Sequence, residues 1–111
     1  MDTAKKKALV SAYKSKKDLG GVYILENREN GRCLLKYAAD IKGAENRFMF
    51  SKSTGSCVEP RLQNDWGDGS GFCFSVVDTL EKSEDWDKLR FAEELKALAA
   101  LWKDKLQKDW Y

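Results

Sequence analysis

The segment GVYILENRENGRCLLKY, residues 21–37, contains the pattern that decides the fold. Residues 22–25 form a short apolar run with β-branched and aromatic side chains, which predicts a strand. Because both faces of this strand are apolar, we expect it to lie in the centre of a sheet. The polar residues that follow end in Asn30-Gly31, a strong hairpin signal because both residues tolerate a positive φ. Residues 32–37 are therefore expected to form the partner strand.

Two helices are predicted directly after the hairpin. Asp40 is placed to cap a helix that runs to about residue 53, and Gly55 lies just past its end. Pro60 stands where a short helix can begin, because proline is tolerated at the first helical position. Leu62 and Trp66 lie four residues apart on that helix.

The rest of the chain predicts one more strand and one long helix. Alternating side chains over residues 72–77, after the glycine-containing loop 67–71, indicate a third strand. Ser83 is expected to cap a final helix over residues 84–108. The buried stripe of this helix has helical spacing and consists of Leu95, Leu98, Ala99, Trp102 and Leu106. The predicted class is α/β (α+β), with a small three-stranded, mainly antiparallel sheet flanked by helices.

The chain of 111 residues fits one domain. We expect a basic N-terminal helix or arm over residues 1–19, a folded domain over residues 20–108 and a C-terminal tail over residues 109–111. Residues 1–17 hold six lysines and one acid and carry +5, whereas the remaining residues carry −3. The basic arm would meet phosphates, and the alternative is a solvated terminal helix.

Composition excludes several classes of chemistry. The chain contains no histidine, which excludes Ser-His-Asp and Cys-His catalysis and a histidine general base. Cys33, Cys57 and Cys73 are odd in number and lack CxxC spacing, which argues against a disulfide framework or a zinc knuckle. They suit a reducing cytoplasm. No apolar run approaches the roughly 20 residues of a membrane span, so we expect a cytoplasmic protein without membrane association.

From Gly21-Val22-Tyr23 onward, over about residues 20–106, the order of elements resembles the GIY-YIG nuclease superfamily. In that family the first strand carries G-[IV]-Y, and a hairpin leads to a second strand that normally ends in Tyr-Ile-Gly. The matching positions here are Leu34-Leu35-Lys36. The family helix that follows carries an arginine, and Arg47 matches it. The resemblance implies metal-dependent phosphodiester hydrolysis on DNA, with Mg²⁺ or Mn²⁺ as the cofactor if the protein is active and no cofactor otherwise.

Carried over residue by residue, the resemblance makes Tyr23 and Arg47 the candidate catalytic residues. It also implies a metal-binding glutamate about one turn before an aromatic residue such as Trp102, at the position of Ala99. Glu94 is the candidate metal ligand nearest to it, but it lies five residues upstream, about 140° around the helix axis. The candidate nucleic-acid-binding residues are Lys36, Lys42, Lys14, Lys16 and Lys17.

Three functional hypotheses follow. The first is a GIY-YIG-type endonuclease with degenerate catalytic motifs that acts on DNA. The second is a catalytically inactive nucleic-acid- or protein-binding module on the same fold, which Leu34, Lys36 and Ala99 favour because they replace the family's chemical groups. The third is a structural or protein-interaction domain, compatible with the negative charge of the body. The substituted motifs leave open whether the chain is an enzyme.

Overall fold

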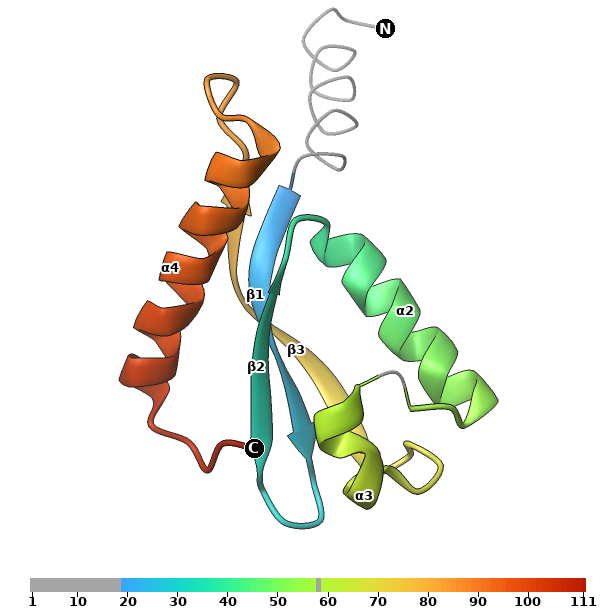
Figure 1. Cartoon of the computed structure of the whole chain (residues 1–111). Helices are drawn as coiled ribbons and strands as arrows, with labels where there is room; N and C mark the ends of the chain where they lie inside the picture. Colours follow the sequence, from blue (N-terminus) through green and yellow to red (C-terminus); the bar gives the residue numbers. More distant parts are fainter. Residues whose placement is uncertain (1–18, 58) are drawn as a thin grey trace, which may run out of the picture.

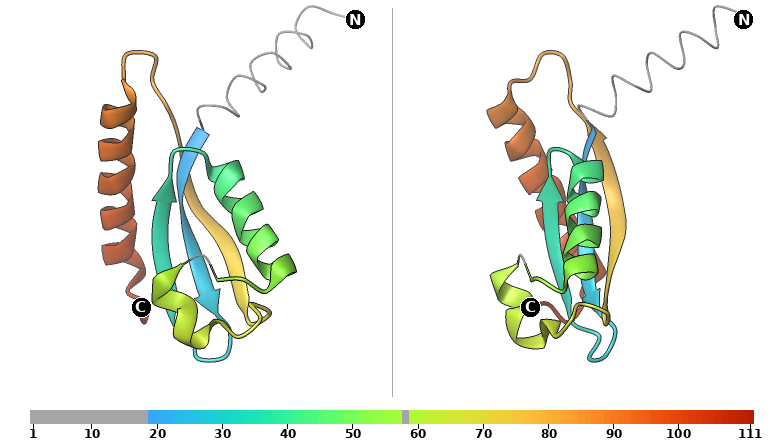
Figure 2. Two further views of the ribbon diagram at one scale, coloured as in Figure 1. Left: turned by 45° about the vertical axis from the view of Figure 1, so that its right-hand side comes forward. Right: turned by 90° about the vertical axis from the view of Figure 1, so that its right-hand side faces the viewer.

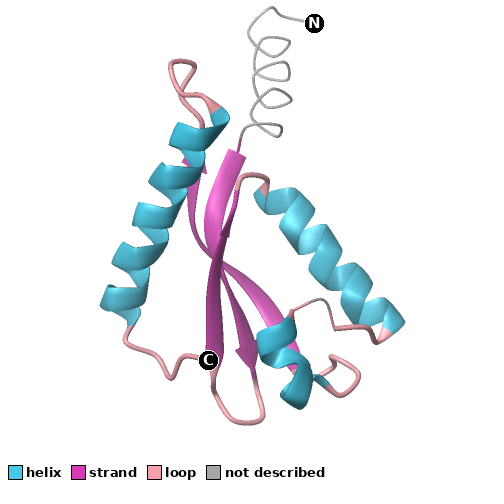
Figure 3. Ribbon diagram, in the orientation of Figure 1, coloured by secondary structure: helices cyan, strands magenta, loops and turns pink. Residues whose placement is uncertain are grey.

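A computed structural model describes residues 19–57 and 59–111 of this chain. Its centre is one antiparallel sheet made of β1 (Leu19–Asn27), β2 (Cys33–Ala38) and β3 (Phe72–Glu81), in the order β2-β1-β3 (Figure 1). The apolar first strand therefore lies between the other two, as its two apolar faces indicated. Helices flank the sheet, which confirms the predicted fold class (Figure 3).

The hairpin between β1 and β2 forms at the predicted turn. Gly31 has a φ of 75° and donates its N–H to the Asn27 carbonyl at 2.8 Å. The register that results places Tyr23 opposite Lys36 and Leu25 opposite Leu34. On its other side, β1 pairs with β3, which continues to Glu81, beyond the predicted end at residue 77.

Two helices cover opposite faces of the sheet. They are α2 (Ile41–Thr54) and α4 (Lys88–Leu106), and the turned views in Figure 2 show the sheet between them. Successive side chains of a strand point to opposite faces, and the glycines of β1 follow this rule. Gly20 faces Phe91 of α4, whereas Gly21 faces Ile41 of α2.

The core is largest on the face that α2 covers. It extends from the sheet and α2 to the short helices η1 (Pro60–Leu62) and α3 (Gln63–Trp66). Its buried members are Tyr23, Leu25, Leu34, Ile41, Ala44, Phe48, Leu62, Trp66 and Phe72. Leu62 of η1 and Trp66 of α3 are both buried in this core. They are the two residues that the sequence placed four apart on the predicted short helix.

The helix ends agree with the sequence for α2 but not for α4. The Asp40 side chain accepts the Gly43 N–H at 3.0 Å, and Gly55 ends α2 with a φ of 73°. The predicted start of the last helix after Ser83 is wrong. Asp87 is the cap and accepts the Arg90 N–H at 2.7 Å, because the chain that leaves the longer β3 still needs a turn before the helix. The helix also ends at Leu106, two residues before the predicted 108.

The last three residues lie against the body at the free edge of β2. Cys33 donates its N–H to the Asp109 carbonyl and accepts the Tyr111 N–H, both at 2.8 Å. The Tyr111 hydroxyl lies 3.0 Å from both the Asn27 amide nitrogen and an Asp65 carboxylate oxygen. Within the described ranges, no helix has the length and apolar character needed to cross a membrane.

The close approach at Gly20 generates a stability prediction. A Cβ at this position would lie 2.7 Å from the Ala38 carbonyl oxygen and 2.8 Å from Phe91 Cζ. Gly20→Ala therefore forces β1 away from β2 or from α4. We expect the free energy of unfolding to fall by about 1–3 kcal/mol in urea titrations. Gly71→Ala is the control, because its nearest neighbour would lie 3.6 Å away, and it is expected to change stability by less than about 0.5 kcal/mol. Equal effects of the two substitutions would contradict the packing described here.

Candidate functional site

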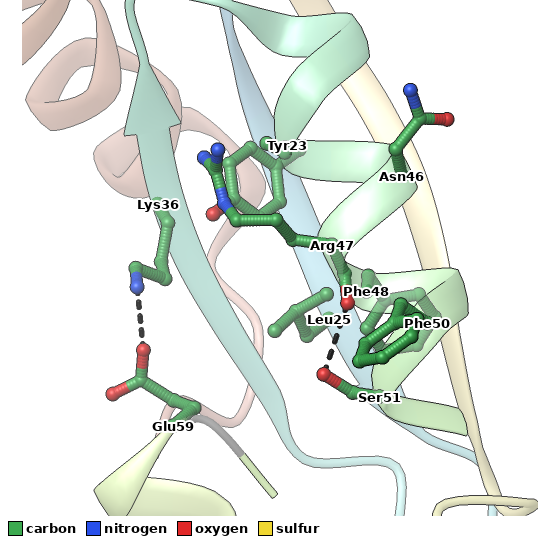
Figure 4. Close-up of a pocket in the computed structure, with 10 residues that line it drawn as sticks. Tyr23, Leu25, Lys36, Asn46, Arg47, Phe48, Phe50, Ser51 and Glu59 are labelled. Atoms are coloured by element: carbon green, nitrogen blue, oxygen red, sulfur yellow. Dashed lines mark hydrogen bonds and ion pairs between the residues drawn. The ribbon is translucent and has the colours of Figure 1, made fainter. Parts of the chain in front are cut away.

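A cavity of about 580 Å³ opens on the face of the sheet that α2 covers. Its walls come from β1, β2, α2 and the segment that precedes η1 (Figure 4). Four lining side chains are charged or carry a hydroxyl on an aromatic ring: Tyr23, Lys36, Arg47 and Glu59. The apolar part of the lining consists of Leu25, Ala44, Phe48 and Phe50. The two remaining lining residues, Asn46 and Ser51, are polar and uncharged.

Strand register and helix position bring these groups together. Tyr23 and Lys36 are direct cross-strand partners, so their side chains project from the same face. Arg47 lies between the buried residues Ala44 and Ser51 on α2, on the side of the helix that turns towards the sheet. The Arg47 residue is exposed, so a ligand in the cavity can reach its guanidinium group. The structure thus unites Tyr23, Arg47 and Lys36 in one cavity.

Tyr23 is 8% exposed and stacks on Phe74, with ring centroids 4.7 Å apart. Burial raises the pKa of the Tyr23 hydroxyl above its ordinary value of 10.0, and the Glu59 carboxylate raises it further, whereas the cations Lys36 and Arg47 lower it. Burial is the largest of these effects. The hydroxyl therefore keeps its proton at neutral pH and can donate a hydrogen bond to a ligand.

Glu59 is the charged residue of this cavity that sequence reasoning missed. Its carboxylate forms an ion pair with the Lys36 ammonium at 2.5 Å, and the side chains are 16% and 40% exposed, respectively. No local pattern links a loop residue before Pro60 to a strand 23 residues upstream. Only the three-dimensional arrangement shows the contact.

The other candidate residues lie elsewhere. Lys42 is exposed in the first turn of α2 and does not line the cavity. Glu94 lies on α4, which covers the opposite face of the sheet, and its carboxylate pairs with Arg90 at 2.9 Å. Lys14, Lys16 and Lys17 lie outside the described residues.

Ala99, the position where the resemblance expects a glutamate, lines a second cavity of about 370 Å³. Leu34, Lys36 and Glu59 line the same cavity, so this position on α4 reaches the site around the edge of β2. An alanine methyl group there supplies no ligand to a metal.

The residues present do not fit a divalent metal ion. In residues 19–57 and 59–111, no three aspartate, glutamate or cysteine side chains gather in a way that could hold one. Glu59 is the carboxylate that lines the larger cavity, and the Lys36 ammonium already occupies it. Lys36 adds a positive charge to this cavity.

Comparisons with known proteins support the fold. No family model matches the sequence, and no curated protein matches it. A mutant of the catalytic domain of intron endonuclease I-TevI superposes with a TM-score of 0.56 and 18% identity, over 79% of this chain and 84% of that chain. The catalytic domain of homing endonuclease I-TevI superposes with a TM-score of 0.53 and 19% identity, over 78% of this chain and 87% of that chain. I-TevI is a GIY-YIG nuclease, so this chain has the GIY-YIG type of fold that the sequence resemblance indicated.

The raised pKa of Tyr23 predicts a loss of stability at alkaline pH. Above the ordinary pKa of 10.0 the unfolded chain releases the Tyr23 proton while the folded protein retains it. The free energy of unfolding therefore falls as the pH rises from this value towards the raised pKa, and Tyr23 contributes no slope at lower pH. Urea unfolding between about pH 8 and about pH 11 should show a shallower decline for Tyr23→Phe than for the wild type. The control Tyr37→Phe, at an exposed residue of β2, should keep the wild-type slope, and an unchanged slope in Tyr23→Phe would refute the prediction.

Proposed function

We propose that this protein is a GIY-YIG-type endonuclease-fold protein that binds the phosphodiester backbone of DNA in the cavity between β1, β2 and α2. The observation that carries the proposal is the convergence of Tyr23, Lys36 and Arg47 in one accessible concave site. Concave sites with a few convergent polar groups are where ligands commonly bind. Two cations and a neutral hydroxyl are suited to an anion that accepts several hydrogen bonds.

Each of the three side chains has a distinct part in this proposal. The planar Arg47 guanidinium can donate two parallel hydrogen bonds to phosphate oxygens. Lys36 donates to Glu59, but an ammonium carries three donors, so it can still approach a phosphate. Tyr23, which keeps its proton at neutral pH, can donate a hydrogen bond to a phosphate oxygen or to a leaving oxygen.

Hydrolysis would rely on the same residues. Arg47 would stabilise the negative charge that develops on the phosphoryl oxygens, and Tyr23 would hold a proton beside the scissile bond. The described residues offer no ligand set for Mg²⁺ or Mn²⁺, the cofactor that the resemblance implies, so this step would depend on the side chains alone. Loss of one stabilising donor typically lowers the rate by about 10²–10³. Because Leu34 cannot transfer a proton and Ala99 cannot bind a metal, we expect slow cleavage.

A second candidate function is a binding module without catalysis. The substitutions that favour it also serve the fold. Leu34 is 5% exposed and belongs to the hydrophobic core, so this position contributes packing. Lys36 and Glu59 form an ion pair that positions a cation for binding.

In the proposed function the basic N-terminal arm adds affinity for DNA. Residues 1–19, with Lys14, Lys16 and Lys17, would add phosphate contacts that do not depend on the DNA sequence to those of the domain over residues 20–108. All three cysteines are free, which suits the cytoplasmic location that we propose.

Arg47→Ala tests binding at this cavity. We expect its affinity for DNA to fall at least about tenfold, because a hydrogen bond to a charged group is worth ~1.5–3 kcal/mol. The slope of log affinity against log salt should shrink by about 0.9 for duplex DNA, since one phosphate contact is lost. Fluorescence anisotropy at several salt concentrations measures both quantities. Lys96→Ala removes an exposed cation of α4 and should leave affinity nearly unchanged; equal losses in both variants would mean diffuse surface binding.

Chelation of metal tests whether binding needs a divalent ion. We expect the affinity for DNA in EDTA to match the affinity with Mg²⁺ or Mn²⁺ at equal ionic strength, because Lys36 and Arg47 supply the positive charge. An affinity that collapses in EDTA and returns with Mn²⁺ would reveal a metal site and contradict this expectation.

Cleavage of single-stranded, duplex and branched DNA with Mg²⁺ or Mn²⁺ separates the two candidate functions. Slow cleavage by the wild type that both Tyr23→Phe and Arg47→Ala abolish supports the endonuclease. Salt-sensitive binding without any cleavage supports the binding module. Absence of both excludes a nucleic-acid function for this cavity.

A further inference from the structure

Phe50 has a position that backbone binding alone does not explain. Its side chain lines the larger cavity, yet the residue is 68% exposed. It follows Arg47 by three residues on α2, a spacing that places both side chains on the same side of a helix. Single exposed apolar residues are ordinary, and what distinguishes Phe50 is its place in the wall of the cavity that also holds Arg47.

The lining of the cavity divides into two chemically different regions. Tyr23, Lys36, Arg47 and Glu59 form a charged region, whereas Leu25, Phe48 and Phe50 form an apolar region. In Figure 4, Phe48 and Phe50 lie next to Ser51, further along α2 than the Arg47 guanidinium. A phosphate needs the charged region only. A ligand that fills both regions must join an anion to an apolar group.

The two phenylalanines differ in how firmly they are held. Phe48 is buried, and its ring centroid lies 6.1 Å from that of Trp66 and 5.7 Å from that of Phe74. Phe50 makes no ring contact with any aromatic residue in the described ranges. Phe48 is thus a fixed wall, and Phe50 is an aromatic ring that remains available to a ligand.

We propose that Phe50 is a stacking platform for an unpaired nucleobase whose adjacent phosphate is bound by Arg47 and Lys36. The inference rests on the proposed function and names its substrate class: single-stranded DNA. A base in a duplex is already stacked and paired, so it can reach Phe50 only after it leaves the helix. The cavity volume of about 580 Å³ falls within the roughly 300–1,000 Å³ of small-molecule sites, which leaves room for a single nucleotide.

Stacking on an aromatic ring tolerates every base, because each base has a π face. The predicted specificity is therefore for strandedness and not for sequence. The backbone contacts of Arg47 and Lys36 serve single-stranded and duplex DNA alike, whereas Phe50 discriminates between them.

The test compares Phe50→Ala with Met49→Ala. Met49 is the neighbouring residue on α2, is 56% exposed and does not line the cavity, so it controls for loss of exposed apolar surface. We expect Phe50→Ala to weaken binding of a single-stranded oligonucleotide by about 5- to 100-fold and to leave duplex binding within about twofold. Phe50→Trp should retain single-strand binding, because tryptophan also offers an aromatic face. Met49→Ala should bind single-stranded and duplex DNA as the wild type does.

A second readout uses an oligonucleotide that carries 2-aminopurine, whose fluorescence falls when the base stacks. The wild type and Met49→Ala should quench it, and Phe50→Ala should not. The stacking proposal is overturned if Phe50→Ala quenches normally, or if it weakens duplex and single-strand binding equally, while Arg47→Ala still lowers affinity. If the wild type shows no salt-dependent binding to any DNA, the proposed function itself fails.

Discussion

The pairing of Tyr23 with Lys36 across the β1–β2 hairpin is the constraint on which the rest of the structure depends. Because side chains alternate between the faces of a sheet, a slip of one residue would send Tyr23 to the face that α4 covers. Gly20 and Gly21 let the neighbouring strands and the two flanking helices approach β1 closely. The register therefore determines both the core and the cavity.

Two of the positions that depart from the Tyr-Ile-Gly pattern have structural roles of their own. Leu34 fills the core, and Lys36 brings its ammonium group to the edge of the cavity, where it pairs with Glu59. In the proposed function, the side chains of Lys36 and Arg47 supply the positive charge that a phosphate requires. Arg47 and the protonated Tyr23 add directional donors. Under the proposal, this arrangement favours phosphate binding more strongly than turnover.

Local signals in the sequence predicted the local structure. Asn30-Gly31 marked the hairpin, and Asp40 and Gly55 marked the ends of α2, because turn and cap chemistry lies within a few residues. The start of α4 was missed because Ser83 and Asp87 are both competent caps, and the length of β3 decides between them. In the site, family resemblance indicated Tyr23 and Arg47, whereas the ion pair of Glu59 with Lys36 joins distant segments and has no local signature.

The most direct test of the central claim is an NMR titration of the ¹⁵N-labelled protein with a short single-stranded oligonucleotide. Binding in this cavity should give chemical-shift changes that concentrate on β1, β2 and α2 around Tyr23, Lys36 and Arg47, and that diminish as salt is added. Shift changes confined to the outer surface of α4, or none at all, would contradict the assignment of this cavity as a phosphodiester site.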